Sequence, residues 1–359
     1  MASSYQILDE RNKLISIDKG GRVLLSTIKL LVIITTMILI LFAGTRVNVG
    51  ADFFAYQDSY NKIRKGLMGV TSIEPIYVLL AKIVSEYRYF LFFIAAFSVV
   101  IKVKAISKLS ICPFMSMLLY FSQVYIQYDM GIIRQGLAMG IVMLSWSFID
   151  TDELKSDYFI VYFLSVLCHY SAAISIIPVL LRKKRIPISA MMIVTTIAII
   201  FSQVGMDRII LTFLVNFLPK NIKLVSAYSR FSTSAAYINS AFSFTNIRRA
   251  ILLAFFCYSY TKSEKTQFHS FLLNTYFIGT VIYYLFSSYV VIAGRLGIYF
   301  CIADIFLFPI SIRTFGKSKM LKLVPVCYAL LVLRNTLGIY TESWMNAPYL
   351  PYSSWLLHF

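Results

Sequence analysis

Charged residues are scarce in this chain of 359 residues: they make up 14% of it, whereas 59% of the residues are hydrophobic. A soluble domain cannot bury that much apolar surface, so the composition excludes a soluble globular protein and predicts an integral membrane protein. The apolar runs are long and do not alternate with polar residues, which favours membrane-spanning helices over strands. We therefore expect one all-α, polytopic membrane domain over residues 1–359, with no soluble domain.

Several motifs of soluble enzymes are also missing. There is no Walker loop, no GxSxG, no HExxH and no paired CxxC, which argues against ATP-driven, serine-hydrolase and zinc-site chemistry. The five cysteines show neither metal nor disulfide spacing and predict buried free thiols. Asp150-Thr151-Asp152 is a triplet that can hold a metal for nucleotide-sugar chemistry, but beside Lys155 at a helix end we interpret it as a solvated turn. We predict no metal and no other cofactor.

Acidic residues are few as well, since Lys plus Arg minus Asp plus Glu is 34 − 16 = +18. The basic residues are scattered through short loops, so nucleic acid is a poor explanation for the excess. Part of it is the ordinary cytoplasmic bias of Lys and Arg in membrane proteins. The remainder indicates an anionic ligand or lipid headgroups.

The apolar runs predict about 10–12 transmembrane helices, one pair of them formed by a broken helix. Residues 1–21 are expected in the cytoplasm, residues 44–88 and 205–249 form external loops, and residues 341–359 form an external tail. Within the first loop, Pro75 predicts the start of a short helix to about Glu86 that lies at the outer surface. Lys102, Lys104 and Lys108 are expected at the cytoplasmic end of a span.

The segment Tyr158–Leu181 decides the topology. As one span it would export the basic run 182–185, against the positive-inside bias. Two half-length helices broken at Cys168-His169-Tyr170-Ser171 keep this run and the later basic loops inside, and such breaks are tolerated where they line a cavity. The broken arrangement places His169 near that cavity.

Polar residues at membrane depth mark the candidate site. The stretch Tyr125–Ala138 carries Asp129 and Arg134 between apolar runs, and we interpret it as one wall of a polar cavity, because charges there are paired, face a cavity or serve a function. Arginine holds phosphate oxygens through a planar fork, so several cations are candidates for a pyrophosphate. The alternatives for these cations are headgroup contacts or salt bridges to Asp52, Glu74, Asp129 or Asp304.

Other side chains could do chemistry at such a cavity. His169 is a candidate general base, because histidine titrates near neutral pH, and the alternative is a hydrogen-bonded core residue. Asp52 and Glu74 could orient or deprotonate an acceptor hydroxyl, or simply cap helices. Tyr56, Tyr299 and the tail tyrosines Tyr349 and Tyr352 could stack on sugar rings.

In this order the motifs resemble a known family, the EpsG-like branch of the Wzy-type polysaccharide polymerases. The matching pieces are Arg46 followed by Gly50-Ala51-Asp52 and Tyr56; Glu74-Pro75; Ile133-Arg134-Gln135-Gly136-Leu137-Ala138; His169-Tyr170-Ser171-Ala172 with Pro178; Arg295-Leu296 with Tyr299; and Pro351-Tyr352. The chain reads Gly-Ala-Asp where the family more often has Gly-Thr-Asp, which leaves the Asp in place.

The resemblance implies a GT-C-like helical bundle whose periplasmic loops form the active site of a metal-independent glycosyltransferase in the bacterial cytoplasmic membrane. Such an enzyme moves a growing glycan from undecaprenyl pyrophosphate onto another lipid-linked repeat unit, to make O-antigen, capsule or exopolysaccharide. The partners implied are these lipid-linked oligosaccharides, membrane lipids, a chain-length regulator and a repeat-unit flippase. A lipid-linked oligosaccharide flippase and a membrane-bound glycan acyltransferase remain alternatives.

On this hypothesis the site residues fall into three groups. The catalytic residues are His169 and Asp52. The pyrophosphate-binding residues are Arg134, Arg295, Arg230, Arg248 and Arg46. The other substrate-binding residues are Glu74, Gln135, Tyr56, Tyr299 and Tyr352.

Overall fold

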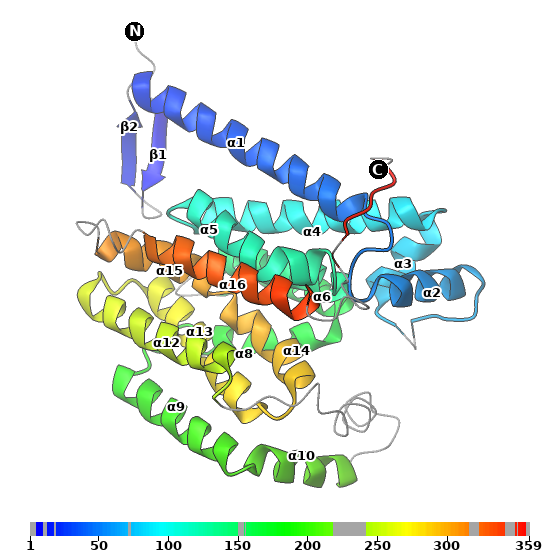
Figure 1. Ribbon diagram of the computed structural model, residues 1–359. Coiled ribbons are helices and arrows are strands. Elements are labelled where there is room, and N and C mark those ends of the chain that lie inside the picture. The colour runs from blue at the N-terminus through cyan, green and yellow to red at the C-terminus, as the bar shows by residue number, and fades with distance from the viewer. Residues whose placement is uncertain are drawn as a thin grey trace.

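The computed structural model describes residues 5–9, 13–17, 19–70, 73–149, 154, 156–217, 242–315, 323–341, 349 and 351–356, with side chains described from residue 29 onward. Arg230 and the triplet 150–152 lie outside the described residues. The described chain is helical apart from a two-stranded antiparallel hairpin near its start, which the sequence analysis did not predict. Most long helices run along one common direction (Figure 1), so the structure has two distinct ends.

The first part of the chain forms the hairpin and the first four helices: β1 (Tyr5–Asp9), β2 (Lys13–Ile17), α1 (Lys19–Gly44), α2 (Phe53–Arg64), α3 (Pro75–Ile83) and α4 (Tyr87–Leu109). The middle part alternates short helices of three kinds: α5 (Pro113–Tyr120), the π-helix η1 (Phe121–Asp129), α6 (Ile133–Ser145), η2 (Trp146–Phe148), α7 (Ser156–Cys168), η3 (Tyr170–Ser175) and α8 (Ile176–Leu180). The last part is α9 (Ile188–Gln203), α10 (Met206–Phe217), α12 (Phe244–Lys262), α13 (Gln267–Leu285), α14 (Val290–Cys301), α15 (Asp304–Thr314) and α16 (Val324–Thr341).

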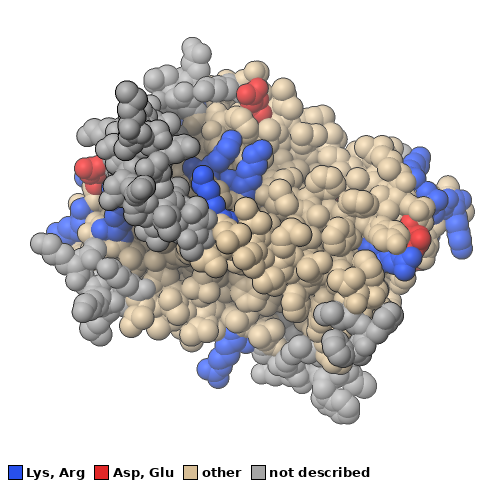
Figure 2. All heavy atoms as spheres, turned by 90° about the horizontal axis from the view of Figure 1, so that it is seen from above, with Lys and Arg blue, Asp and Glu red and all other residues tan. Residues whose placement is uncertain are grey.

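Only α4, among the described helices, is by itself long and apolar enough to cross a membrane. The pair α14 and α15 passes the same criterion together, with a bend of 45° between the two helices. Large apolar side chains are nevertheless exposed along several other helices, and Figure 2 shows broad areas without charged side chains. Examples on α1, α7 and α9 are Ile33, Met37, Phe159, Phe163, Ile193 and Ile197. The number of spans stays a prediction, and these apolar faces are of the kind that contacts lipid or another protein.

The predicted helix break is confirmed. Helix α7 ends at Cys168, and His169 adopts an extended backbone (φ −158°, ψ 118°) before the chain enters η3. The hydroxyl of Tyr162 donates to the carbonyl of Ala173 over 2.8 Å, eleven residues later, so the chain folds back beside α7. The break exposes backbone groups that a continuous helix would have paired, and it places an imidazole at its apex.

Two of the basic loops meet at one end of the bundle. Arg185 Nη2 donates to the carbonyl of Lys265 over 3.1 Å, which joins the loop after α8 to the loop before α13. In Figure 1 the hairpin β1–β2 lies toward this end, whereas α2, α3 and the C-terminal segment lie at the other. The N-terminal hairpin and two basic loops thus lie toward one end of the bundle, and the side of the membrane that this end faces stays a prediction.

The segment between α1 and α4 is compactly folded. Pro75 occupies the first turn of α3, as predicted, and the helix ends at Ile83 rather than at Glu86. Tyr56, Tyr60 and Tyr77 pack with Phe90 into an aromatic cluster that ties α2 and α3 to α4.

The C-terminal segment pairs with the chain that follows α1. Val47 N–H donates to the carbonyl of Ser353, and Trp355 N–H donates to the carbonyl of Thr45, both over 2.9 Å. A side-chain hydrogen bond of 2.7 Å between Thr45 and Ser354 adds to this pairing. The C-terminal segment is thereby held against the loop between α1 and α2.

A buried ion pair corrects one prediction. Lys102, expected at the cytoplasmic end of a span, has a fully buried side chain, and its Nζ lies 2.6 Å from Asp129 Oδ1. Lys102 also donates to Ser98 and to the carbonyl of Gly136, while Tyr120 donates to the second carboxylate oxygen of Asp129. A buried charge is tolerated only when it is paired and hydrogen-bonded, so this network fastens α4 to the turn between η1 and α6.

Candidate active site

Glu74 joins two of the predicted site residues. It is the residue before α3, and its side chain is 5% exposed. One carboxylate oxygen, Oε1, lies 2.8 Å from Nδ1 of His169, and the other, Oε2, forms an ion pair with Nη1 of Arg134. The N-cap of α3, the helix break and α6 therefore meet at one carboxylate.

The surroundings of Glu74 fix its charge. Burial raises the pKa of the carboxyl group, but the hydrogen bond with His169 and the positive charge of Arg134 outweigh burial and lower the pKa to about 2. The carboxylate is therefore ionised at physiological pH and accepts a hydrogen bond from Nδ1–H of His169. In the neutral tautomer that this hydrogen bond favours, Nε2 carries no proton.

Nε2 of His169 is buried and has no hydrogen-bond partner among the residues that the structure describes. Buried polar atoms are normally paired, so an unpaired basic nitrogen at a helix break indicates a place for a ligand. The arrangement of carboxylate, imidazole and open nitrogen is that of an oriented general base.

Arg134 is fixed by aromatic rings as well as by Glu74. It is the second residue of α6, and its guanidinium carbon lies 5.3 Å from the ring centroid of Tyr56 and 5.6 Å from that of Tyr77. The Tyr77 hydroxyl donates to the backbone carbonyl of Tyr56 over 2.9 Å, which holds the two rings in place. Cation–π contacts favour the charged guanidinium, and Nε of Arg134 is buried and unpaired within the described residues.

Asp52 lies near the same cations. It occupies the N-cap position of α2, yet its side chain makes no capping hydrogen bond. Burial raises the pKa of this half-buried carboxyl, and the charges of Arg134 and Arg295 oppose the rise. Helix capping therefore does not account for Asp52, and its carboxyl is affected electrostatically by two of the predicted pyrophosphate ligands.

Helix α14 forms the remaining wall. Gln135 Nε2 donates to the backbone carbonyl of Arg295 over 3.0 Å, and Ser171 donates to the hydroxyl of Tyr299 over 3.3 Å. The first contact joins α6 to α14, and the second joins η3 to α14. The side chain of Arg295 is exposed, so it can contact a ligand from outside.

Two predicted residues lie near the end of α1, away from this cluster. Arg46 is 3% exposed and donates to the backbone carbonyls of Val49 and Ala43, so it braces the turn after α1. Tyr352 donates to the carbonyl of Phe42 over 2.9 Å and packs on that ring. Neither is in contact with the Glu74–His169–Arg134 cluster in the described contacts, and both belong to the closure between α1 and the C-terminal segment.

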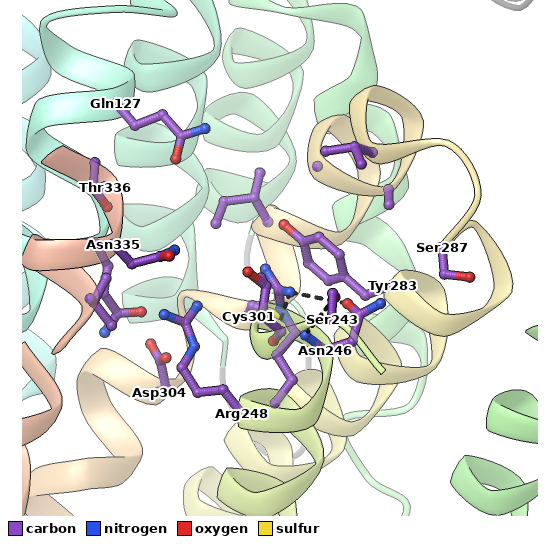
Figure 3. A pocket seen from close by; sticks show the side chains of 18 of the residues that line it. Gln127, Ser243, Asn246, Arg248, Tyr283, Ser287, Cys301, Asp304, Asn335 and Thr336 are labelled. Carbon is purple, nitrogen blue, oxygen red and sulfur yellow. Dashed lines mark hydrogen bonds between the residues drawn. The ribbon is translucent and has the colours of Figure 1, made fainter. Parts of the chain in front are cut away.

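Arg248 lines a separate cavity of about 370 Å³ between η1, α12, α14, α15 and α16 (Figure 3). Asp304 faces the same cavity, and the sequence analysis named it only as a potential salt-bridge partner for arginine. In the sequence, Asp304 stands directly before an apolar run, where a charged residue is costly and often functional. Among the described residues, no group of three or more His, Cys, Asp or Glu side chains is placed to hold a metal ion.

Comparisons with known proteins agree with the motifs. A search of curated proteins finds no match, and a search of solved structures finds none. The family model of EpsG matches residues 29–354, which extend from α1 to the C-terminal segment that pairs with the loop after α1. The resemblance inferred from the sequence is thereby confirmed at the level of the family: the chain belongs to the EpsG family.

Proposed function

We propose that the chain is a membrane glycosyltransferase that polymerises lipid-linked oligosaccharide repeat units at the outer face of a bacterial cytoplasmic membrane. Its family supports a polymerase-like role in polysaccharide synthesis. The observation that carries the catalytic part is the Glu74–His169 pair, because it leaves a buried imidazole nitrogen open to a ligand.

In the proposed reaction, His169 Nε2 takes the proton from a hydroxyl of the acceptor sugar. The hydroxyl oxygen forms a bond to the anomeric carbon of the donor glycan, and the bond from that carbon to the pyrophosphate oxygen breaks. Undecaprenyl pyrophosphate leaves with the bonding electrons. Glu74 stabilises the imidazolium that forms, because its carboxylate stays ionised beside it.

Negative charge grows on the pyrophosphate as the bond breaks. The exposed Arg295 and the unpaired Nε edge of Arg134 are the cations that we assign to it. Asp52, with its raised pKa, is the second candidate for proton transfer, and Gln135, Tyr56 and Tyr299 position the sugars. Arg46 and Tyr352 have structural roles in this proposal, and Arg230 lies outside the described residues.

The experiment is deletion of the gene followed by gel analysis of the surface glycan. The strain is complemented with wild type, His169→Ala, Arg134→Ala or Arg88→Ala. Arg88 is a matched control, because it also pairs with a glutamate, Glu86, over 2.7 Å but on the surface. We expect a ladder with wild type and Arg88→Ala, and single repeat units with His169→Ala and Arg134→Ala.

Other outcomes would replace the proposal. Loss of all surface glycan, with repeat units retained inside the cell, identifies a flippase. An intact ladder with altered decoration identifies an acyltransferase. Normal ladders from both His169→Ala and Arg134→Ala remove these residues from the chemistry.

A further inference from the structure

The cavity beside Arg248 is not explained by the reaction above. It lies on the other side of α14 from the proposed active site: Tyr299 contacts η3, whereas Gly294, Ile298 and Cys301 line the cavity. Its volume of about 370 Å³ falls within the range of roughly 300–1,000 Å³ that is usual for small-molecule sites. The cavity is therefore large enough for a ligand of its own.

Three residues that line this cavity each have a buried polar atom without a hydrogen-bond partner among the described residues. These atoms are Nε2 of Gln123, Nε of Arg248 and Oδ1 of Asp304. Asp304 is 2% exposed, and its other oxygen lies 3.3 Å from the hydroxyl of Tyr328. Buried polar groups are nearly always satisfied, so three unsatisfied groups around one cavity indicate a polar ligand.

The unpaired donor and acceptor atoms restrict the ligand. Arg248 and Asp304 face the same space (Figure 3), but they form no ion pair with each other in the described part of the chain. Arg249 is already occupied, because it lies over the ring of Tyr283 at 3.3 Å and donates to Thr245 and Asn246. A ligand must therefore accept from Arg248 and donate to Asp304.

Neighbouring hydroxyl groups of an uncharged sugar meet both demands, since a hydroxyl both donates and accepts. An anion without a hydrogen-bond donor satisfies Arg248 but leaves the unpaired oxygen of Asp304 without a partner. The rings of Tyr276, Tyr283 and Tyr328 also line the cavity and provide apolar faces next to the polar groups, as sugar-binding surfaces require.

We propose that this cavity is a binding site for an uncharged saccharide, whose hydroxyls bridge Asp304 and Arg248. The proposal rests on the function proposed above, because it assigns the site to a neutral sugar of the repeat unit. The cavity then selects the glycan, while the residues on the opposite side of α14 carry out transfer.

Gly294 offers a test that leaves the polar groups in place. It lines the cavity, and a Cβ atom added there meets no atom within 4 Å. Gly294→Phe fills the cavity, and Gly294→Ala is the matched control because it adds only the Cβ. Asp304→Asn replaces one acceptor oxygen by a donor NH2 with little change in shape, and His169→Ala disables the proposed base without touching the cavity.

The measurement is saturation-transfer difference NMR on the full chain in nanodiscs. The probes are the methyl glycosides of glucose, galactose, rhamnose and N-acetylglucosamine, with methyl glucuronide and inorganic pyrophosphate as anionic probes. We expect at least one neutral glycoside to give a signal with wild type, Gly294→Ala and His169→Ala. We expect Gly294→Phe and Asp304→Asn to lose most of that signal, at least fivefold, while eluting from size-exclusion chromatography like wild type.

The proposal is overturned if no neutral glycoside binds, if Gly294→Phe binds as well as Gly294→Ala, or if only the anionic probes give a signal that Gly294→Phe abolishes. The two proposals can fail separately. A normal ladder in the deletion strain together with glycoside binding blocked by Gly294→Phe removes the polymerase and keeps the sugar site. A collapsed ladder with binding unaffected by Gly294→Phe does the reverse.

Discussion

Glu74 and His169 are 95 positions apart, and their side chains are joined by a 2.8 Å hydrogen bond between Oε1 and Nδ1. Glu74 sits immediately before α3, and His169 sits where α7 ends. Glu74 lies where a helix begins and His169 where one ends, so each side chain is held by backbone geometry as well as by its partner. The pair connects the segment between α1 and α4 to the broken helix.

This pair predicts a non-additive loss of activity. His169→Ala removes the base, and general acid–base groups contribute roughly 10²–10⁴-fold, so we expect a loss of that size in the rate of polymerisation. Glu74→Gln leaves the imidazole without its ionised partner and is expected to lose about tenfold or more. The double variant should be no slower than His169→Ala, because the carboxylate acts through the imidazole. The measurement is chain growth by reconstituted protein from purified lipid-linked repeat units.

An additive loss in the double variant would contradict this interpretation and give Glu74 a separate role on the substrate. The control is Glu86→Gln, which removes a glutamate paired with Arg88 on the surface. It should leave the rate unchanged.

The lowered pKa of Glu74 predicts a pH-dependent contribution to stability. The carboxyl has a pKa of about 2 in the folded protein, against an ordinary value of 4.5. The unfolded chain binds this proton first as the pH falls, so the stabilisation is complete above about pH 4.5 and is lost towards pH 2. Arg134 keeps its charge throughout this range.

We therefore expect the difference in Tm between wild type and Glu74→Gln to be largest at pH 5 and to shrink steadily towards pH 2.5. Differential scanning fluorimetry of the detergent-solubilised proteins measures it. A difference that stays constant over this window would show that the ionised carboxylate adds no stability.

The network of Lys102 and Asp129 predicts a second coupling, in stability rather than in activity. Lys102→Met leaves the charge of Asp129 buried without its partner, and Asp129→Asn does the same to the charge of Lys102. Removing one partner of a buried ion pair typically costs about 3–5 kcal/mol. The double variant Lys102→Met with Asp129→Asn removes both charges and should recover part of that loss. Thermal unfolding in detergent measures all three variants. If the double variant is as unstable as the sum of the single ones, the two charges do not stabilise each other.

Sequence reasoning succeeded where the physical signal is local. The helix start at Pro75 follows from the fixed φ of proline, and the break at His169 follows from the high free-energy cost of exporting four basic residues. The residue types at the site were also visible, because Arg134 and His169 are costly in apolar surroundings.

Sequence reasoning failed where a contact depends on packing between distant segments. Lys102 looked like one of three boundary lysines, because nothing in the sequence places Asp129 beside it. The π-helix η1 and the close approach at Gly136, where a Cβ would collide with the carbonyl of Tyr128, create that contact. A salt bridge from one of the arginines to Glu74 was among the alternatives, and Arg134 makes it. That Glu74 also contacts His169 was not predictable, since it requires three elements to converge.

The two ends of the bundle predict which residues face each side of the membrane. Lys65, after α2, and Lys183, in the basic run after α8, are both exposed. In a cysteine-free background, we expect Lys65→Cys to react with a membrane-impermeant maleimide on intact cells. Lys183→Cys should react only after the membrane is permeabilised, because basic loops remain in the cytoplasm.

This labelling experiment also tests the placement of the catalytic pair. The segment 44–88 contains Glu74 as well as Lys65, so labelling of Lys65→Cys from outside puts the Glu74–His169 pair on the side where polymerisation is proposed. Labelling of both positions on intact cells would mean that α7, η3 and α8 together form one complete span. Labelling of Lys183→Cys alone would invert the bundle, place the pair near the cytoplasm, and favour a cytoplasmic acyl donor over a lipid pyrophosphate on the outer face.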